Sequence, residues 1–342
     1  MSSVPSDWFI DVNPLSAMYG AAASWRRRWY AREPSRARRL ARPVISVGNL
    51  RVGGSGKTPV VACLAEALLQ RGEHPAILSR GYGRRHAPPG ATVVSDGAQL
   101  RGDLASSGDE PLMLARRLPR VPVVVADDRY LAGTLAERQL GATVHLLDDG
   151  FQHLKLARDV DLLLVDESDL AEPVLPVGRL REPIENAAQA DALLVTASSF
   201  DAAARVGAVL GVPRVVQVTR ALMPPRWLDS EAPVAIDGRV LAMAGIARPS
   251  RFFHDLEAAG AMVAERMAFA DHHPYTQRDV DRVIARARAA GAAMVATTEK
   301  DAVRLGGLDW HGLPVVFFPL EARIMPEEPF MTWLVERLRT RR

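Results

Sequence analysis

Residues 43–59 read PVISVGNLRVGGSGKTP, a short apolar run followed by a glycine-rich segment and then by Gly-Lys-Thr. Apolar side chains continue at helical spacing at Val60, Val61, Leu64, Ala65, Leu68 and Leu69. A strand, a glycine-rich turn and a helix start in this order are typical of a phosphate-binding loop, because glycines let backbone N–H groups close on phosphate oxygens. The stretch therefore predicts a nucleotide-binding loop in an α/β fold.

The expected nucleotide contacts of this loop are Arg51, Val52, Gly53, Gly54, Ser55, Gly56, Lys57 and Thr58. We expect the Lys57 ammonium to reach the β- and γ-phosphates of ATP or GTP, and the Thr58 hydroxyl to bind Mg²⁺. The strict pattern has glycine where this chain has Arg51, so an ordinary glycine-rich turn is the alternative. Only three of the 43 basic residues are lysines, at 57, 155 and 300. One of them stands where the chemistry needs a compact ammonium.

The composition is that of a soluble globular protein. The chain has 342 residues, of which 48% are hydrophobic and 24% charged, and a domain typically has about 150 residues, so we expect two domains. The single cysteine, Cys63, allows no disulfide within the chain and fits a reducing cytoplasm. The chain lacks the run of about 18 apolar residues that a spanning helix needs, and its first residues do not have the pattern of a signal peptide.

Short apolar runs alternate with helical stretches, which predicts a doubly wound α/β sheet of the P-loop NTPase kind and a second, smaller α/β domain. The predicted strands of the first part are 43–48, 75–79, 92–95, 121–126, 143–148, 160–165 and 192–197, and its helices are 57–71, 109–118, 130–140 and 183–190. A second alternation starts near residue 238 and ends with a helix at 327–340. The predicted parts are an N-terminal helix (1–42), a P-loop domain (43–212), a proline-containing linker (213–237) and a C-terminal domain (238–342).

The basic character of the chain is concentrated at its N-terminus. Residues 1–42 hold eight arginines and three acidic residues, whereas the whole chain carries a net charge of only +3. Large apolar residues recur there at helical spacing and form what we call the apolar stripe: Leu15, Met18, Tyr19, Ala22, Trp25 and Trp29. This pattern predicts an amphipathic helix in the headgroup layer of an anionic membrane. A helix packed on the protein's own core is the open alternative, and a nucleic-acid arm is less natural because the aromatics share one stripe.

A second motif, VHLLDDGFQH at residues 144–153, places two carboxylates at the end of an apolar strand. In phosphate-loop enzymes an aspartate at this edge of the sheet holds Mg²⁺, directly or through water. We therefore expect Asp148 and Asp149 to be the metal-side carboxylates, opposite Thr58. Asp-Asp-Gly is also common in turns, so a plain turn is the alternative.

Two groups are candidates for taking a proton from an acceptor hydroxyl. Asp109 stands at a predicted helix start, where the helix dipole also favours a carboxylate for purely structural reasons. His272 and His273 follow Asp271 after the predicted strand 262–269. An enzyme that phosphorylates an alcohol needs such a carboxylate or imidazole near the acceptor.

Two arginine clusters follow predicted strand ends. Arg80 lies in SRGYGRR at residues 79–85, and Arg179 and Arg181 lie in PVGRLREP at residues 176–183. Guanidinium groups match the geometry of phosphate oxygens, so these three arginines are candidates for holding an anionic acceptor. For each of them the alternative is a solvated surface arginine.

Taken together, the motifs resemble the tetraacyldisaccharide 4′-kinases, the lipid A 4′-kinase family of Gram-negative bacteria. In order they are GNLRVGGSGKTP (48–59), SRGYG (79–83), GDEP (108–111), DDGFQH (148–153), GRLREP (178–183), DHH (271–273) and TTEKD (297–301). The similarity runs from the N-terminal helix to about residue 305. The family does not require glycine at the position of Arg51.

The resemblance implies an ATP- and Mg²⁺-dependent kinase that phosphorylates the 4′-hydroxyl of a tetraacyldisaccharide 1-phosphate to give lipid IVA. It implies a cleft between two domains, with the 43–212 segment as the kinase domain. It also implies a peripheral position on the cytoplasmic face of the inner membrane, with the N-terminal helix in contact with that surface. We expect neither nucleic acid nor an obligate protein as a partner.

The resemblance also assigns site residues. It implies a catalytic pair of Asp109 with one of the two histidines, of which we favour His272, and Lys57 acts with them. It places Arg179 or Arg181 against the sugar or phosphate of the lipid. For Lys300 and Asp301, a structural salt bridge and a catalytic role both remain open.

Two other classes of protein are considered. One is a membrane-associated ATPase switch of the MinD type, although such switches carry a lysine directly before the Gly-Gly of the loop, where this chain has Val52. The other is a non-catalytic protein that binds nucleic acid through residues 1–42.

Overall fold

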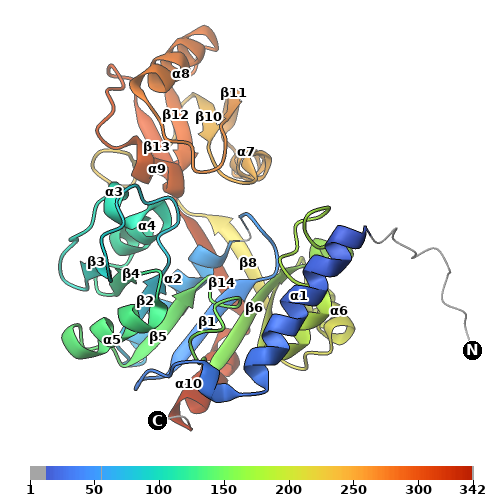
Figure 1. The fold of residues 1–342 in the computed structure, drawn as a ribbon. Coiled ribbons are helices and arrows are strands. Elements are labelled where there is room, and N and C mark those ends of the chain that lie inside the picture. Colours follow the sequence, from blue (N-terminus) through green and yellow to red (C-terminus); the bar gives the residue numbers. More distant parts are fainter. Residues whose placement is uncertain (1–12, 55, 341–342) are drawn as a thin grey trace, which may run out of the picture.

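The computed structural model describes residues 13–54 and 56–340, which form two α/β domains (Figure 1). The contact predicted for Ser55 and the first part of the predicted segment 1–42 lie outside the described residues. The α/β class and the presence of a second, smaller α/β domain agree with the sequence prediction.

In the described residues, the larger domain has a nine-stranded sheet in the order β14-β8-β7-β6-β1-β5-β2-β4-β3. Its strands are β1 (Val44–Asn49), β2 (Pro75–Ser79), β3 (Thr92–Asp96), β4 (Pro122–Val125), β5 (Val144–Asp148), β6 (Val160–Asp166), β7 (Ala192–Thr196), β8 (Val215–Leu222) and β14 (Leu320–Met325). Neighbouring strands are parallel except at the edges, where β3 pairs with β4 and β14 with β8. β1 lies between β5 and β6, so the glycine-rich loop and the paired aspartates emerge from adjacent strand ends.

Helices cover both faces of this sheet, because its continuous apolar strands have two faces to bury. One face carries α2 (Lys57–Gln70), α4 (Asp109–Arg117) and α10 (Glu327–Arg339), which share one hydrophobic core with β1. The opposite face carries α5 (Arg129–Gln139) and α6 (Phe200–Leu210). This arrangement leaves the carboxyl edge of the strands open, which is where α/β enzymes bind their ligands.

The smaller domain has a five-stranded sheet in the order β11-β10-β12-β13-β9 within the described residues. Its strands are β9 (Arg226–Trp227), β10 (Arg239–Ala244), β11 (Met262–Ala268), β12 (Met294–Thr298) and β13 (Val315–Phe318). α7 (Pro249–Ala258) and α8 (Gln277–Ala289) cover its two faces. α9 (Glu299–Leu305) packs against α4, so this helix joins the smaller domain to the larger one.

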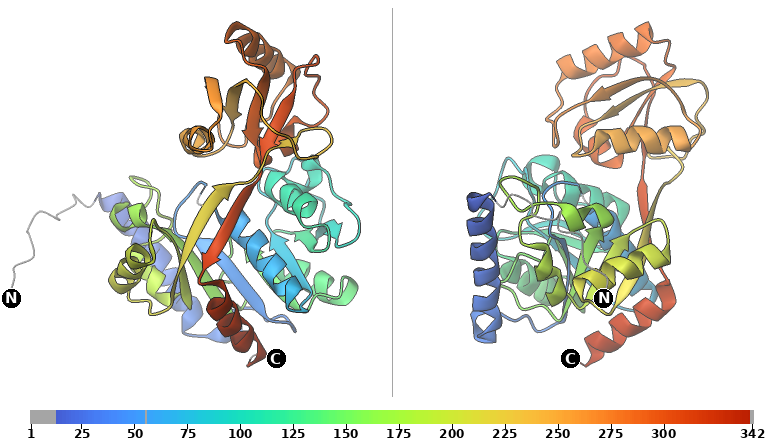
Figure 2. Two further views of the ribbon diagram at one scale, coloured as in Figure 1. Left: turned by 180° about the vertical axis from the view of Figure 1, so that it is seen from behind. Right: turned by 90° about the vertical axis from the view of Figure 1, so that its right-hand side faces the viewer.

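The boundary between the domains differs from the predicted one. The sequence assigns 213–237 to a linker, but β8 within it is a strand of the large sheet and pairs with β14. α10, predicted as the closing helix of the C-terminal domain, buries Phe330 and Leu334 in the core of the larger domain. The chain therefore enters the smaller domain after β8 and returns along β14, as Figure 2 shows.

One other local prediction differs from the structure, and other elements were not predicted. The helix predicted at 183–190 is a short 3₁₀ segment, Ile184–Gln189. Neither α6 nor β14 was predicted. β14 pairs with a strand that is remote in the sequence, and local apolar spacing carries no information about such a partner.

α1 (Pro14–Ala31) lies along the larger domain and packs on it through small and polar side chains (Figure 2). Ser16 Oγ donates a hydrogen bond to the Val174 carbonyl at 3.0 Å. Arg27 forms a buried two-point ion pair with Glu182, at 2.7 and 2.8 Å, and also donates to the Phe151 carbonyl at 2.9 Å. These contacts fix α1 to the loops that carry the DDGFQH and GRLREP motifs.

The apolar stripe of α1 faces away from the protein. Met18 is 70% exposed, and Leu15 and Trp25 are each 61% exposed. α1 therefore packs on the protein, as the alternative expects, but through its small and polar side chains and not through the apolar stripe. None of the helices in residues 13–54 and 56–340 has the length and apolarity needed to cross a membrane.

Candidate active site

The glycine-rich loop connects β1 to α2 at the centre of the carboxyl edge. Gly53 and Gly56 have φ angles of 92° and 82°, a region that glycine adopts without strain. Gly56 is the N-cap of α2, and Lys57 and Thr58 are its first residues. The unpaired N–H groups and the positive dipole end of such a helix start favour an anionic ligand. This geometry is that of a phosphate-binding turn.

The first two residues of the loop make other contacts. The Arg51 guanidinium pairs with Asp169 at 3.1 Å and with Glu172 at 3.3 Å. The Val52 N–H donates to the Arg179 carbonyl at 2.8 Å. These groups hold the loop to the larger domain, so the geometry does not support the nucleotide contacts predicted for Arg51 and Val52.

Lys57 lies over the strand ends, where it meets the paired aspartates. Its Nζ donates to Asn49 Oδ1 at 2.8 Å and is 3.3 Å from Asp149 Oδ1. Arg181 binds the same Asp149 carboxylate through both terminal nitrogens, at 2.8 and 2.7 Å, and donates to Asn49 Oδ1 at 2.6 Å. Asn49, Lys57, Asp149 and Arg181 form what we call the nucleotide-side cluster. The sequence analysis missed Asn49, whose only signal is its place between β1 and the loop.

Asp148 and Asp149 have opposite electrostatic environments. Burial, reinforced by the negative charge of Glu110, raises the pKa of Asp148 to about 7. Burial also raises the pKa of Asp149, but the positive charges of Lys57 and Arg181 have a larger effect. They hold the pKa of Asp149 well below its usual range. The pair therefore joins a carboxyl that protonates easily to one that stays ionised.

The residues expected to hold Mg²⁺ fit that ion by their chemistry. Thr58, Asp148 and Asp149 offer only oxygen atoms, which are the ligands that Mg²⁺ prefers. Asp148 Oδ1 is buried and has no hydrogen-bond partner, so this atom lacks the compensation that a buried carboxylate oxygen needs. The described part of the chain holds no preformed cluster of three or more His, Cys, Asp or Glu ligands. Mg²⁺ is commonly held by one or two carboxylates together with phosphates and water.

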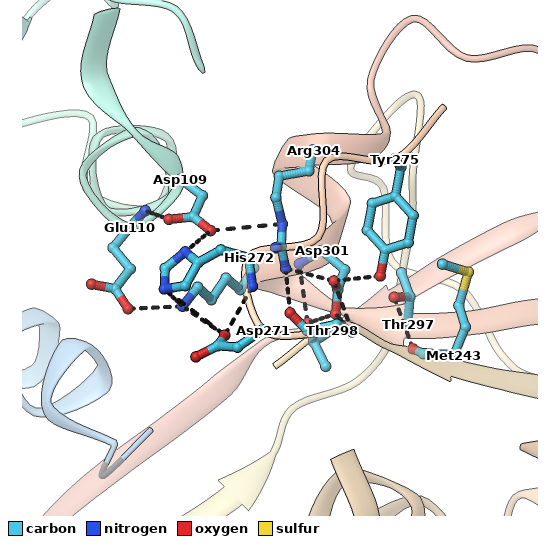
Figure 3. A network of polar contacts seen from close by, with 12 residues as sticks. Asp109, Glu110, Met243, Asp271, His272, Tyr275, Thr297, Thr298, Asp301 and Arg304 are labelled. Carbon is cyan, nitrogen blue, oxygen red and sulfur yellow. Dashed lines mark hydrogen bonds and ion pairs between the residues drawn. The ribbon is translucent and has the colours of Figure 1, made fainter. Parts of the chain in front are cut away.

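The predicted acid–imidazole pair is assembled from both domains (Figure 3). Asp109 begins α4 in the larger domain, whereas His272 follows β11 in the smaller one. His272 Nδ1 lies 2.8 Å from Asp109 Oδ2. His273 instead lies 3.1 Å from Asp279 Oδ2, at the start of α8. Of the two histidines that the sequence leaves open, the structure brings His272 to Asp109.

Two cations of α9 face this pair. Lys300 Nζ is 2.9 Å from Glu110 Oε1 and 3.2 Å from His272 Nε2, and Arg304 Nε is 3.6 Å from Asp109 Oδ2. Burial alone would raise the pKa of Asp109. The hydrogen bond of His272 and the charges of Lys300 and Arg304 outweigh burial and hold this pKa below its usual range. Asp109 is therefore a buried but ionised carboxylate. Asp109, His272 and Lys300 form what we call the acceptor-side cluster.

The remaining arginines lie around these clusters. Arg80 and Arg179 are exposed. Burial and the charge of Arg80 lower the pKa of Arg129 to about 10, so these two cations lie close together. Arg220 of β8 lies against Gly56, where a Cβ would clash with its guanidinium. The sequence analysis missed Arg129 and Arg220, because each lies inside an ordinary helix or strand pattern.

The chain has curated relatives and a solved structural relative. The sequence model of the family described as tetraacyldisaccharide-1-P 4′-kinase matches residues 8–339. A tetraacyldisaccharide 4′-kinase of Koribacter versatilis is 37% identical over 337 residues, which cover 96% of this chain and 99% of that protein. One of Geobacter metallireducens is 41% identical over 323 residues, with coverages of 93% and 95%. The crystal structure of LpxK from Aquifex aeolicus in complex with ATP matches with a TM-score of 0.76 and 32% identity, covering 95% of this chain and 98% of that one.

Proposed function

Because this chain belongs to the tetraacyldisaccharide-1-phosphate 4′-kinase family, we propose that its two clusters divide phosphoryl transfer between them, one holding ATP and the other activating the sugar hydroxyl. The protein is a kinase that uses ATP and acts in lipid A biosynthesis. The alternative of a MinD-type ATPase switch is therefore set aside. The observation that carries the proposal is the 2.8 Å contact of Asp109 with His272 across the two domains.

The nucleotide-side cluster receives the triphosphate. The backbone of residues 53–58 and the Lys57 ammonium bind the β- and γ-phosphates. Thr58, Asp148 and Asp149 hold Mg²⁺, which neutralises charge on the phosphates when bound. Arg181 was expected to hold the acceptor, but its contacts with Asp149 and Asn49 support a different role. It orients the Asp149 carboxylate.

The acceptor-side cluster activates the hydroxyl. Asp109 accepts the proton of the 4′-hydroxyl while the hydroxyl oxygen forms a bond to the γ-phosphorus. The bond between this phosphorus and the bridging oxygen breaks, and ADP leaves with that electron pair. The product carries phosphate at the 4′-position as well as the 1-phosphate that the acceptor already had. His272 holds the Asp109 carboxylate in position through its Nδ1.

The acceptor is a tetraacyldisaccharide 1-phosphate, which is anchored in a bilayer by its acyl chains. We assign the exposed Arg80 and Arg179 to its sugar or phosphate groups, because guanidinium groups match phosphate oxygens. The apolar stripe of α1 offers aromatic and apolar side chains to the headgroup layer, next to the arginines that follow it in the sequence. These features support a peripheral position on the cytoplasmic face of the inner membrane, where ATP is available.

The proposal is tested with the full-length protein, radiolabelled ATP and the purified lipid acceptor in mixed micelles. The expected product is a bisphosphorylated lipid that carries the label at the 4′-position, with no labelling of an acceptor that lacks the 4′-hydroxyl. Asp109→Asn is expected to remove nearly all of this product while nucleotide binding persists. Transfer at the normal rate by this variant would show that Asp109 is not the base.

A further inference from the structure

Lys300 occupies an unusual position among the basic residues of the chain. It is one of only three lysines among 43 basic residues, and its Nζ stands between three partners. Glu110 Oε1 at 2.9 Å and His272 Nε2 at 3.2 Å are hydrogen-bond partners, and Asp271 Oδ1 at 3.7 Å is an ion-pair partner. An ammonium directs three N–H groups outward from one point, whereas the donors of an arginine lie in one plane. The site therefore suits lysine and not the arginine that the chain uses almost everywhere else.

The contact of Lys300 with His272 determines which nitrogen of the imidazole carries hydrogen. A lysine ammonium can only donate, so His272 Nε2 must accept. In a neutral imidazole the hydrogen then resides on Nδ1. Nδ1 faces Asp109 Oδ2 at 2.8 Å, so this N–H donates to the carboxylate. The three groups form a directed chain, from the ammonium through the imidazole to the carboxylate. Figure 3 shows the imidazole of His272 facing the carboxylate of Asp109.

We propose that Lys300 is a positioning residue for phosphoryl transfer, which holds His272 in the Nδ1–H tautomer and so directs that hydrogen to Asp109. The inference rests on the proposed role of Asp109 as the base. Lys300 transfers no proton itself. It also holds Glu110 of the larger domain, so the ammonium ties the orientation of His272 to the packing of α9 against α4.

The neighbouring residue Asp301 has a structural role. It is fully buried, and its carboxylate accepts hydrogen bonds from the Gly245 N–H at 3.1 Å, the Tyr275 hydroxyl at 2.8 Å and the Thr298 hydroxyl at 2.6 Å. Arg304 donates to it as well, at 2.6 Å. These bonds fix the start of α9 to β10 and β12, so Lys300 projects from a rigid support.

Asp109 and its partners form a network of charged and titratable groups that determines how the protonation of Asp109 responds to the loss of Lys300. His272 and Arg304 contact Asp109 itself. Their neighbours are Glu110 and Asp271 beside Lys300, Asp301 beside Arg304, and Tyr82, whose ring lies 5.2 Å from that of His272. Removing the Lys300 cation leaves four carboxylates around one imidazole and one guanidinium. The pKa of Asp109 then rises, because an opposite charge that favoured its ionised form is gone.

The test compares Lys300→Met and Lys300→Arg with the full-length wild-type enzyme, in the lipid kinase assay from acidic to alkaline pH. Lys300→Met should lower kcat/KM for the lipid about tenfold at neutral pH, a part of what a general base contributes, and move the acid limb of the profile to higher pH. Lys300→Arg keeps the charge, so its acid limb should stay in place while kcat falls. The exposed lysine variant Lys155→Met is the matched control and should behave as wild type.

An NMR measurement of the His272 tautomer tests the role of Lys300 independently of the role of Asp109. Long-range proton–nitrogen NMR spectra of the imidazoles, with His272→Gln for assignment, should show the Nδ1–H form of His272 in the wild type and lose it in Lys300→Met. An unchanged tautomer, or wild-type turnover with an unshifted acid limb, would overturn the proposal. So would a variant whose only defect is a lower Tm. If Asp109→Asn alone retains full activity, the base assignment fails instead, whatever the tautomer of His272.

Discussion

The nucleotide-side cluster and the acceptor-side cluster are built in different ways. The first lies wholly in the larger domain, where β1 and β5 are adjacent and bring Asn49 and Asp149 together. The second draws Asp109 from α4 of the larger domain, and His272 and Lys300 from the smaller one. One cluster is formed within the larger domain alone, whereas the other forms only when the smaller domain lies against α4.

We therefore expect nucleotide binding and phosphoryl transfer to be separable properties of the molecule. Lys57 at the start of α2 and the paired aspartates at the end of β5 are positioned within the larger domain, where β1 and β5 are adjacent. Asp109, the proposed base, has His272 as its partner only when α9 and the loop at 271–273 lie against the larger domain. Damage to the acceptor-side cluster should therefore lower transfer without lowering nucleotide affinity, and damage to the nucleotide-side cluster should lower both.

The largest effect is expected from Asp109→Asn. An amide cannot take the proton of the hydroxyl, so kcat should fall by about 10²–10⁴, the usual contribution of a general base. The Kd for ATP should stay close to that of wild type, because the nucleotide-side cluster is intact. The matched control is Asp201→Asn, an exposed aspartate at the start of α6. A parallel loss of ATP binding by Asp109→Asn would show that the two clusters are not separable.

The pH dependence of turnover tests the role of Asp109 independently. The pKa of Asp109 is held below its usual range despite burial, by His272, Lys300 and Arg304. The carboxylate therefore stays ionised as the pH falls and is lost as a base only when the pH passes below this lowered pKa. With saturating ATP and Mg²⁺, so that the raised pKa of Asp148 in the free enzyme adds no limb near pH 7, we expect kcat to stay level down to the ordinary range of an aspartate. His272→Gln removes one of the lowering interactions, so its acid limb should lie at higher pH.

A second, slightly smaller effect is expected from Lys57→Met. The variant removes the ammonium that meets the β- and γ-phosphates, so kcat/KM for ATP should fall by about 10²–10³, as for the loss of one charge-stabilising donor. In contrast to Asp109→Asn, it should also weaken ATP binding, as measured by isothermal titration with a non-hydrolysable analogue. Because Lys57 lies outside the acceptor-side cluster, the His272 tautomer should not change. A changed tautomer would mean that the clusters are coupled.

The two clusters also differ in how far the sequence predicts them. Lys57, Asp148 and Asp149 lie in contiguous motifs whose order of strand, glycine turn and helix is itself the signal. The parallel neighbours β1 and β5 then place them together by the ordinary geometry of such sheets. Asn49 was missed because an asparagine at a strand end has many structural uses, and only its contacts with Lys57 and Arg181 distinguish it.

The acceptor-side cluster was predicted in part. Its motifs indicate Asp109 and a histidine, and the resemblance favours His272, but only the structure shows that His272 contacts Asp109 whereas His273 contacts Asp279. The place of Lys300 depends on the packing of α9 against α4. The predicted boundary at 238–342 failed for the same reason, since the pairing of β8 with β14 is a long-range contact. Local patterns predict elements, whereas contacts across domains need the assembled structure.

An intermediate effect is expected from Asn49→Leu. The side-chain oxygen of Asn49 accepts from both Lys57 and Arg181, and one hydrogen bond to a charged group is worth about 1.5–3 kcal/mol. The KM for ATP should therefore rise about tenfold or more, while the pH profile of kcat keeps its acid limb. Gln217→Leu is the matched control, because it removes an amide that donates to the Ala197 carbonyl just after β7. A shifted acid limb in Asn49→Leu would contradict the separation of the clusters.

The smallest effect on chemistry is expected from α1, which touches neither cluster directly but presents the apolar stripe. In Met18→Ser combined with Trp25→Ser, two exposed side chains are lost without disturbing the buried contacts of Ser16 and Arg27. Each side chain that inserts into the headgroup layer contributes up to about 1.5–3 kcal/mol, so partitioning into anionic vesicles should fall at least about tenfold. KM for the vesicle-borne acceptor should rise in step. Val209→Ser on α6, equally exposed at 70%, should leave both quantities unchanged. The opposite result, normal vesicle binding with a lower kcat, would contradict this role of α1. It would mean that α1 acts on the clusters through Arg27 and Glu182, and that the clusters are not independent of the helix.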